Sequence, residues 1–88
     1  MKLVLNKTYG AFEMPPEIMD KYGYESQYDS IARDNPDLIE YVKRYGYVCR
    51  GTDLRVVTIS DEATDFEILE YDGVESVVYV VGGKLCWA

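Results

Sequence analysis

The sequence predicts a small α+β fold, with an antiparallel sheet of four to five strands in the order β-α-α-β-β-β and two short helices on one face. Three observations support this prediction. Two segments begin with proline and end with glycine at a helical length, and they are followed by Leu54–Ile59, which has apolar residues on both faces. An Asp-Gly pair then separates two β-rich runs, which is a strong hairpin signal. A chain of 88 residues is expected to form a single domain over residues 1–88.

The first elements are expected to be a short strand and a short helix. Three apolar residues at Leu3–Leu5 stand between polar neighbours, which is typical of a strand. A helix is expected to begin at Pro15-Pro16, because proline is tolerated in the first turn. Gly23 is expected to end that helix, since glycine readily adopts the left-handed conformation that follows a helix.

The second helix has the clearest boundaries in the sequence. Asn35 is a favourable N-cap residue, Pro36 suits the first turn, and Gly46 is expected to end the helix. The apolar and tyrosine residues between these limits recur at helical spacing, so we expect them to face the core. They are Leu38, Tyr41, Val42 and Tyr45.

The remaining strands follow from apolar runs and the turns between them. Leu54–Ile59 has apolar residues on both faces, so it is expected in the centre of the sheet. Phe66–Tyr71 and Val74–Val81 are expected to form a hairpin. Gly82-Gly83 permits a second tight turn into a last strand at Lys84–Trp87.

The register of this hairpin depends on its turn. A two-residue loop at Asp72-Gly73 places Glu70 opposite Glu75, on the face that also carries apolar residues. Two like charges in opposed positions cost stability unless they are splayed into solvent or neutralised. A three-residue loop with Gly73 in a bulge would instead pair Glu70 with Val74 and relieve the repulsion.

The charge of the chain is distributed unevenly. The net charge is −7, and the stretch from Val56 to Gly83 contains seven acids and no base, while the rest of the chain balances to zero. We predict that these acids lie on a rigid projecting hairpin and bind a basic surface of a partner protein. The alternative is a solvated acidic face that aids solubility. The seven residues are Asp61, Glu62, Asp65, Glu67, Glu70, Asp72 and Glu75.

Tyrosines form a second group of candidate contact residues. The chain has nine tyrosines, and Tyr24, Tyr28 and Tyr47 are the three that we single out as secondary contacts with a partner. Tyrosine combines a large apolar ring with a hydroxyl group and few rotatable bonds, which suits it to interfaces. The alternative is that these rings line the margin of the core where it meets water.

Several kinds of chemistry are disfavoured by the composition. The chain has no histidine, so it has no Ser-His or Cys-His nucleophile pair and no histidine-based metal site. Cys49 and Cys86 form no C-x-x-C motif and are expected to be reduced in a cytoplasmic setting. The nine bases are scattered, which disfavours direct nucleic-acid binding. No stretch is long enough to span a bilayer. We therefore predict no catalytic residues, no metal and no cofactor.

Some segments of the chain resemble small phage- and prophage-encoded proteins. The matching segments read LVLNKTYGAF, RDNPDLIEYV, LRVVTI and FEILEYDGVE, and Trp87 matches at the end. In that group the first segment typically follows a K-[IL]-V-[IL]-N-K-x-Y-G-x-F pattern, and a D-P-x-L-I pattern marks a helix. The chain departs from the group at Thr8, where the group favours cysteine, and at Ala11, where it favours a second glycine. The resemblance implies a mobile-element context and residence in the cytoplasm of a bacterial host.

Charge and resemblance together lead to one functional hypothesis and two alternatives. The hypothesis is a phage-type interaction protein that blocks a basic, nucleic-acid-binding surface of a host protein. An anti-CRISPR inhibitor that imitates the phosphate charge of DNA is its sharpest form. The first alternative is a homo-oligomeric structural or accessory phage protein, for which a homodimer is one arrangement. The second is a ligand-binding module or small enzyme, which would need a pocket lined by tyrosines and carboxylates.

Overall fold

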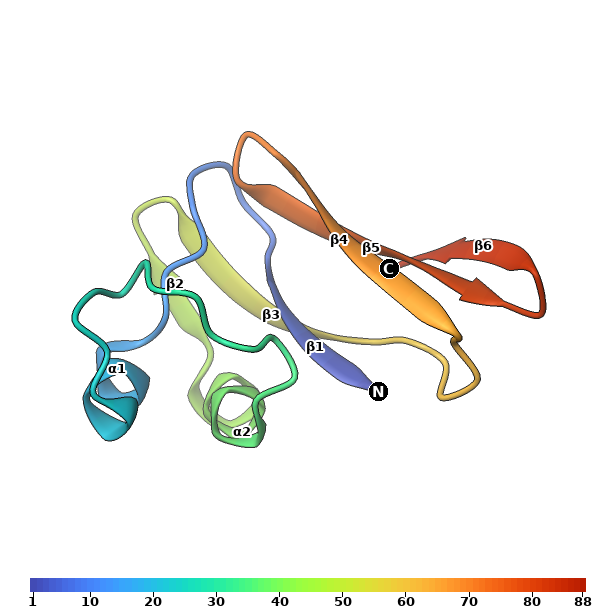
Figure 1. Cartoon of the computed structure of the whole chain (residues 1–88). Coiled ribbons are helices and arrows are strands. Elements are labelled where there is room, and N and C mark those ends of the chain that lie inside the picture. Colours follow the sequence, from blue (N-terminus) through green and yellow to red (C-terminus); the bar gives the residue numbers. More distant parts are fainter.

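The computed structural model describes residues 1–88 as two helices and six strands (Figure 1). The elements are β1 (Lys2–Asn6), α1 (Pro16–Tyr22), α2 (Pro36–Tyr45), β2 (Tyr47–Cys49), β3 (Thr52–Thr58), β4 (Asp65–Tyr71), β5 (Val74–Val81) and β6 (Lys84–Trp87). The strands form two antiparallel sheets of three, in the orders β1-β3-β2 and β4-β5-β6. The predicted α+β class is confirmed. The prediction of one sheet is wrong, and β2 is a strand that the sequence patterns did not indicate.

Both helices begin and end at the residues that the sequence indicates. The Asn35 side-chain oxygen accepts hydrogen bonds from the amides of Asp37 (2.9 Å) and Leu38 (3.1 Å) at the start of α2. Gly23 follows α1 in the left-handed conformation with φ 72°, and Gly46 follows α2 with φ 69°. These local signals are sufficient to fix the helix limits, because each one satisfies backbone groups that the helix itself leaves unpaired.

The first core lies between the helices and the first sheet, so the predicted placement of the helices on one face is confirmed. Its buried members are Val4, Met14, Ile18, Ile31, Leu38, Val42 and Leu54. Tyr41 packs against this core, but Tyr45 is 68% exposed, so its predicted place in the core is wrong. Tyr45 stands in the last turn of α2, where its ring packs against Tyr41 with the ring centroids 5.2 Å apart.

A second core joins the two sheets, and it explains why the chain forms two sheets rather than one. Successive side chains of a strand point to opposite faces, so Val4 faces the helices while Leu3 and Leu5 face the second sheet. Leu3 and Leu5 pack with Ile59 and Val77, and all four residues are buried. β1 is therefore covered on both faces, and the helices, the first sheet and the second sheet form successive layers (Figure 1).

The hairpin of β4 and β5 has the two-residue turn that Asp72-Gly73 predicts. Asp72 has φ 51° and Gly73 has φ 90°, and two positive φ values in succession are characteristic of a type I′ turn. Glu70 lies opposite Glu75 and Tyr71 lies opposite Val74, so the predicted two-residue register is confirmed.

The tip of this hairpin does not project into solvent, which corrects a prediction. It lies against the loop that follows β1, where the Gly10 amide donates to the Asp72 carbonyl oxygen at 2.9 Å. A Cβ atom on Gly73 would overlap the backbone of Gly10, and one on Gly10 would overlap that of Gly51. The end that projects is the turn between β5 and β6, at Gly82-Gly83 (Figure 1). Neither helix has the length and apolar character needed to cross a membrane.

The close approach of Gly73 to Gly10 generates a prediction about stability. Gly83 has a similar positive φ of 79°, but no atom lies within 4 Å of the position that its Cβ would occupy. Gly83→Ala should lower the free energy of unfolding by about 1–2 kcal/mol, which is the cost of left-handed backbone in alanine. Gly73→Ala should cost at least about 2 kcal/mol more, because the backbone must also separate. Urea denaturation measures both variants, and equal losses would show that the hairpin tip is not docked.

Candidate protein-interaction surface

Glu75 lies in the protein interior, unlike the other carboxylates of the predicted acidic surface. It is 6% exposed and forms a two-pronged ion pair with Arg33. The two terminal nitrogens of Arg33 donate to the two carboxylate oxygens at 2.5 and 2.8 Å, and the Asn6 amide donates to one of them at 2.8 Å. The prediction that Glu75 contacts a partner is therefore wrong, because its carboxylate already has three internal donors.

Arg33 is held in place by further contacts. Its guanidinium group lies 3.6 Å from the centroid of the Phe12 ring and also donates to the Val4 carbonyl oxygen at 3.2 Å. A guanidinium over an aromatic face is favourable, and more so when it is shielded from water. Lys7 adds a hydrogen bond from its ammonium group to the Glu75 carbonyl oxygen at 2.8 Å. We call Asn6, Lys7, Arg33 and Glu75 the polar junction.

Asn6 connects the polar junction to three further segments. Its side-chain amide donates to the carbonyl oxygens of Gly73 (2.9 Å) and Thr8 (3.1 Å), and its side-chain oxygen accepts from the Asp53 amide (2.8 Å). Asn6 is fully buried, and no buried side-chain nitrogen or oxygen in the protein lacks a hydrogen-bond partner. The junction therefore fixes the hairpin to the first sheet without leaving a polar group unsatisfied.

The sequence contained one signal for this junction. Opposed glutamates at Glu70 and Glu75 require either neutralisation or separation, and the structure supplies both. Arg33 neutralises Glu75, while the Glu70 carboxylate turns back to accept from the Gly73 amide and stays exposed. The identity of the cation could not be inferred, because Arg33 is 42 residues from Glu75 in the chain.

Asp61 is exposed but has a partner within the chain. The amino group of Met1 donates to its carboxylate at 2.5 Å. This contact holds the pKa of Asp61 below its usual value, because the positive amino group stabilises the ionised carboxylate. Asp61 is thus a weaker candidate for contact with a partner than its neighbours.

Five carboxylates of the base-free stretch are exposed and have no cationic partner. They are Glu62, Asp65, Glu67, Glu70 and Asp72. Most of them lie on β4 or in the segments just before and after it, and β4 is an edge strand of the second sheet. Charged side chains on an edge strand also protect it from pairing with another chain. The structure therefore leaves an open acidic edge, which we call the acidic strand.

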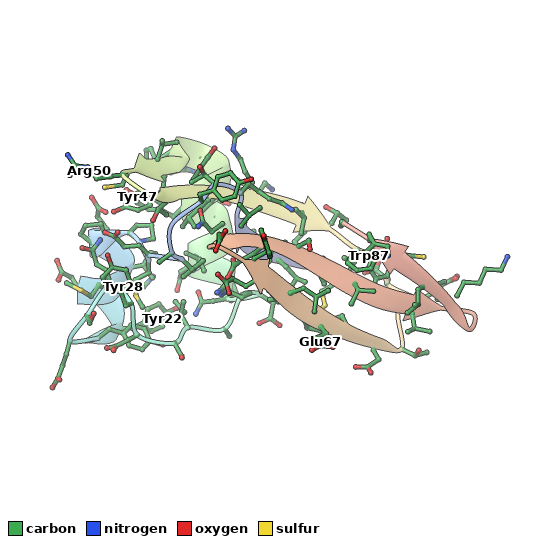
Figure 2. The ribbon with its side chains drawn as sticks, turned by 90° about the horizontal axis from the view of Figure 1, so that it is seen from above. Tyr22, Tyr28, Tyr47, Arg50, Glu67 and Trp87 are labelled. Carbon is green, nitrogen blue, oxygen red and sulfur yellow. The ribbon has the colours of Figure 1, made fainter.

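The acidic strand borders an open apolar surface. Two rows cross the second sheet: Asp65, Val80 and Leu85 are paired in one, and Glu67, Val78 and Trp87 in the next. Leu85 is 69% exposed and Trp87 is 61% exposed, and no helix or strand packs on this side of the sheet. Figure 2 shows Glu67 and Trp87 on the two outer strands of this sheet. We call the side chains of these two rows the outer face, and a shallow hollow of about 140 Å³ lies on it.

The candidate tyrosines do not extend this surface. Tyr24 packs against the first core, and the Tyr47 hydroxyl accepts a hydrogen bond from Gln27 at 3.1 Å. Burial raises the pKa of Tyr47 to about 12, because the ionised phenol would be poorly solvated there. Only Tyr28 of the three is exposed, and it lies at the α1 end of the molecule, away from Glu67 and Trp87 (Figure 2).

Three bases, Lys43, Arg44 and Arg55, line part of a groove of about 460 Å³ between the end of α2 and the first sheet. Arg44 is paired with Glu40 at 3.5 Å and Arg55 with Asp53 at 2.9 Å, so much of this positive charge is already compensated. The two cysteines are free and lie in different sheets, on β2 and β6.

Comparison of the chain with protein-family models, with curated proteins and with solved structures gives no match. Any function of the chain must therefore be inferred from the surfaces described above.

The polar junction generates a prediction about stability. Glu75→Gln should lower the free energy of unfolding by about 3 kcal/mol, because it leaves the charge of Arg33 without a partner in a largely buried site. Glu67→Gln is a matched control on the facing strand, where the side chain is exposed and unpaired, and it should change stability by less than about 0.5 kcal/mol. Urea denaturation of both variants measures the difference. Equal, small effects would mean that the junction is not a structural determinant.

Proposed function

We propose that this protein is a non-enzymatic binding protein whose acidic strand occupies a basic, nucleic-acid-binding surface of a partner protein. The observation that carries the proposal is the open row of carboxylates at the edge of the second sheet, in a stretch that contains no base. An uncompensated row of one sign attracts an oppositely charged surface and accelerates its association.

The spacing of the carboxylates determines how closely the acidic strand can match the charge density of DNA. Side chains on one face of a strand recur about every 6.7 Å, whereas successive phosphates of one DNA strand advance about 3.4 Å along the helix axis. Asp65 and Glu67 therefore carry about half the linear charge density of one DNA strand. Glu62 and Asp72 flank β4, while Glu70 lies on the opposite face of the strand from Asp65 and Glu67. Charge alone would then give weaker attraction than DNA provides, so the neighbouring apolar side chains would have to contribute to affinity.

The segments that carry the phage resemblance support the nature of the partner. Three of them meet at the polar junction, through Asn6, Arg33 and Glu75. The resemblance supports the further proposal that the protein acts in the cytoplasm of a bacterial host, with an RNA-guided nuclease or another DNA-binding defence protein as its partner.

One observation favours a second candidate function. Leu85 and Trp87 are large apolar side chains left open to solvent, which is typical of a surface that is covered in an assembly. A homo-oligomeric accessory protein would bury this surface against another copy, and the acids would then serve solubility.

The proposal predicts that charge reversal on the acidic strand abolishes inhibition. The triple variant Glu62→Lys, Asp65→Lys, Glu67→Lys is compared with a control that reverses Asp20, Glu25 and Asp34, which are equally exposed and unpaired but lie outside the stretch. Purified guide-loaded nucleases from a panel of types are mixed with a fluorescent target duplex, and bound DNA is measured by anisotropy.

The wild type and the control variant should displace DNA from at least one nuclease. The acidic-strand variant should need at least about tenfold more protein for the same effect. Added salt should weaken direct binding of the wild type to that nuclease, measured in the absence of DNA, since exposed charges are screened. Equal loss in both variants would attribute the effect to net charge alone. No displacement from any nuclease by the wild type would contradict the inhibitor proposal.

A further inference from the structure

The outer face changes from acidic to apolar across the width of the sheet. In each of its two rows a carboxylate on β4 is followed by a valine on β5 and a large apolar residue on β6. Val78 and Val80 form the centre, and Leu85 and Trp87 form the margin opposite the acids. A ligand that matches this order needs cationic groups along one side and apolar groups along the adjacent side.

The dimensions of the outer face suit one helix. The outer strands of a three-stranded sheet are about 10 Å apart, and the two rows lie two residues apart, which is about 6.7 Å along β5. A helix with its side chains is about 10–12 Å wide and rises about 5.4 Å per turn, so about two turns of one helix would cover the face along the strands. With the width of the side chains added, the area is roughly 200 Å², well below the roughly 800 Å² per partner of a standard protein interface. The face is therefore too small to hold two copies together by itself.

A second copy is also disfavoured by symmetry. In a two-fold dimer the two outer faces pack on each other, and the direction of the two-fold axis decides which strand of one copy lies on which strand of the other. If the two-fold axis runs across the strands, β4 meets β4 and the carboxylates of Asp65 and Glu67 oppose each other. If it runs along the strands, β4 meets β6, and the same carboxylates lie on Leu85 and Trp87 without a cationic partner. Both arrangements cost free energy, because they bury uncompensated charge.

We infer that the outer face binds a basic amphipathic helix of the partner protein, with its apolar side chains on Val78, Leu85 and Trp87 and its Lys or Arg side chains toward Asp65 and Glu67. This inference deepens the proposed function and rests on it for the role of the acidic strand. It adds that affinity depends on the apolar margin, where an exposed tryptophan is well suited to be an anchor residue.

The test uses the full chain and a defined probe. Trp87 is the only tryptophan in the chain, so its fluorescence reports directly on the outer face. The probe is a blocked peptide of about 14 residues, about 20 Å long as a helix, with leucines on one side and lysines on the other. A peptide of the same composition with scrambled spacing is the negative control.

Variants separate the apolar contribution from the charge. Leu85→Ser removes an exposed apolar side chain from the outer face, and Val48→Ser removes one from β2 in the first sheet, where Val48 is 75% exposed. The wild type and Val48→Ser should show a saturable blue shift of Trp87 emission with the amphipathic peptide and none with the scrambled one. Leu85→Ser should bind at least about tenfold more weakly. The pair Asp65→Asn, Glu67→Gln should also weaken binding and reduce its salt dependence.

Three outcomes would overturn the inference. The first is no shift with the amphipathic peptide. The second is equal binding of the peptide by Leu85→Ser and Val48→Ser. If charge reversal on the acidic strand still abolishes displacement of DNA in the nuclease assay, that result would reject the helix site and leave the proposed function in place. The third is a blue shift of Trp87 on concentration of the free protein, with a dimer in sedimentation analysis, which would assign the face to a second copy.

Discussion

The ion pair between Arg33 and Glu75 is the interaction on which the arrangement of the two sheets depends. Taking two charges out of water is costly, and their attraction offsets that cost only where the geometry is good and the remaining hydrogen-bonding groups are satisfied. Both conditions hold here, because the carboxylate also accepts from the Asn6 amide and the guanidinium lies on the Phe12 ring. The second core joins the sheets through only four buried apolar side chains, so the directional contacts of the junction are needed to fix how one sheet meets the other.

This junction also determines which surfaces of the second sheet are open to solvent. Because the hairpin tip is held against Gly10, the acids near the tip border the first sheet, and the open part of β4 lies beyond it. The same constraint directs one side of the second sheet toward the second core, and the other side is left to solvent. The acidic strand and the apolar margin at Trp87 thus belong to one rigid sheet, so a ligand can contact both without a conformational change. A surface that is organised in advance loses less entropy on binding.

Local signals in the sequence were sufficient for the helices and the turns, because the residues at Asn35 and Asp72-Gly73 satisfy or shape their own backbone. The division into two sheets could not be predicted, since it depends on contacts between residues far apart in the chain, such as Gly10 with Gly73. The acidic stretch was identified correctly as a group of charges, but its division into an internal and an open part depends on Arg33. Alternation placed both Glu70 and Glu75 on the apolar face of the hairpin, and only Glu75 has an internal cation, so the pattern alone could not show which of the two is structural.

The most direct test of this account is amide hydrogen exchange measured by NMR under native conditions. The Asn6 amide donates to the Glu75 carboxylate and the Gly10 amide donates to Asp72, so both report on the joint between the sheets. If the junction makes the two sheets one cooperative unit, these two amides should exchange as slowly as the slowest amides of β3, through global unfolding. Exchange at both amides faster than in β3 by about a hundredfold or more, with β3 still protected, would show that the second sheet separates locally. That result would contradict the claim that the Arg33–Glu75 pair unites the fold.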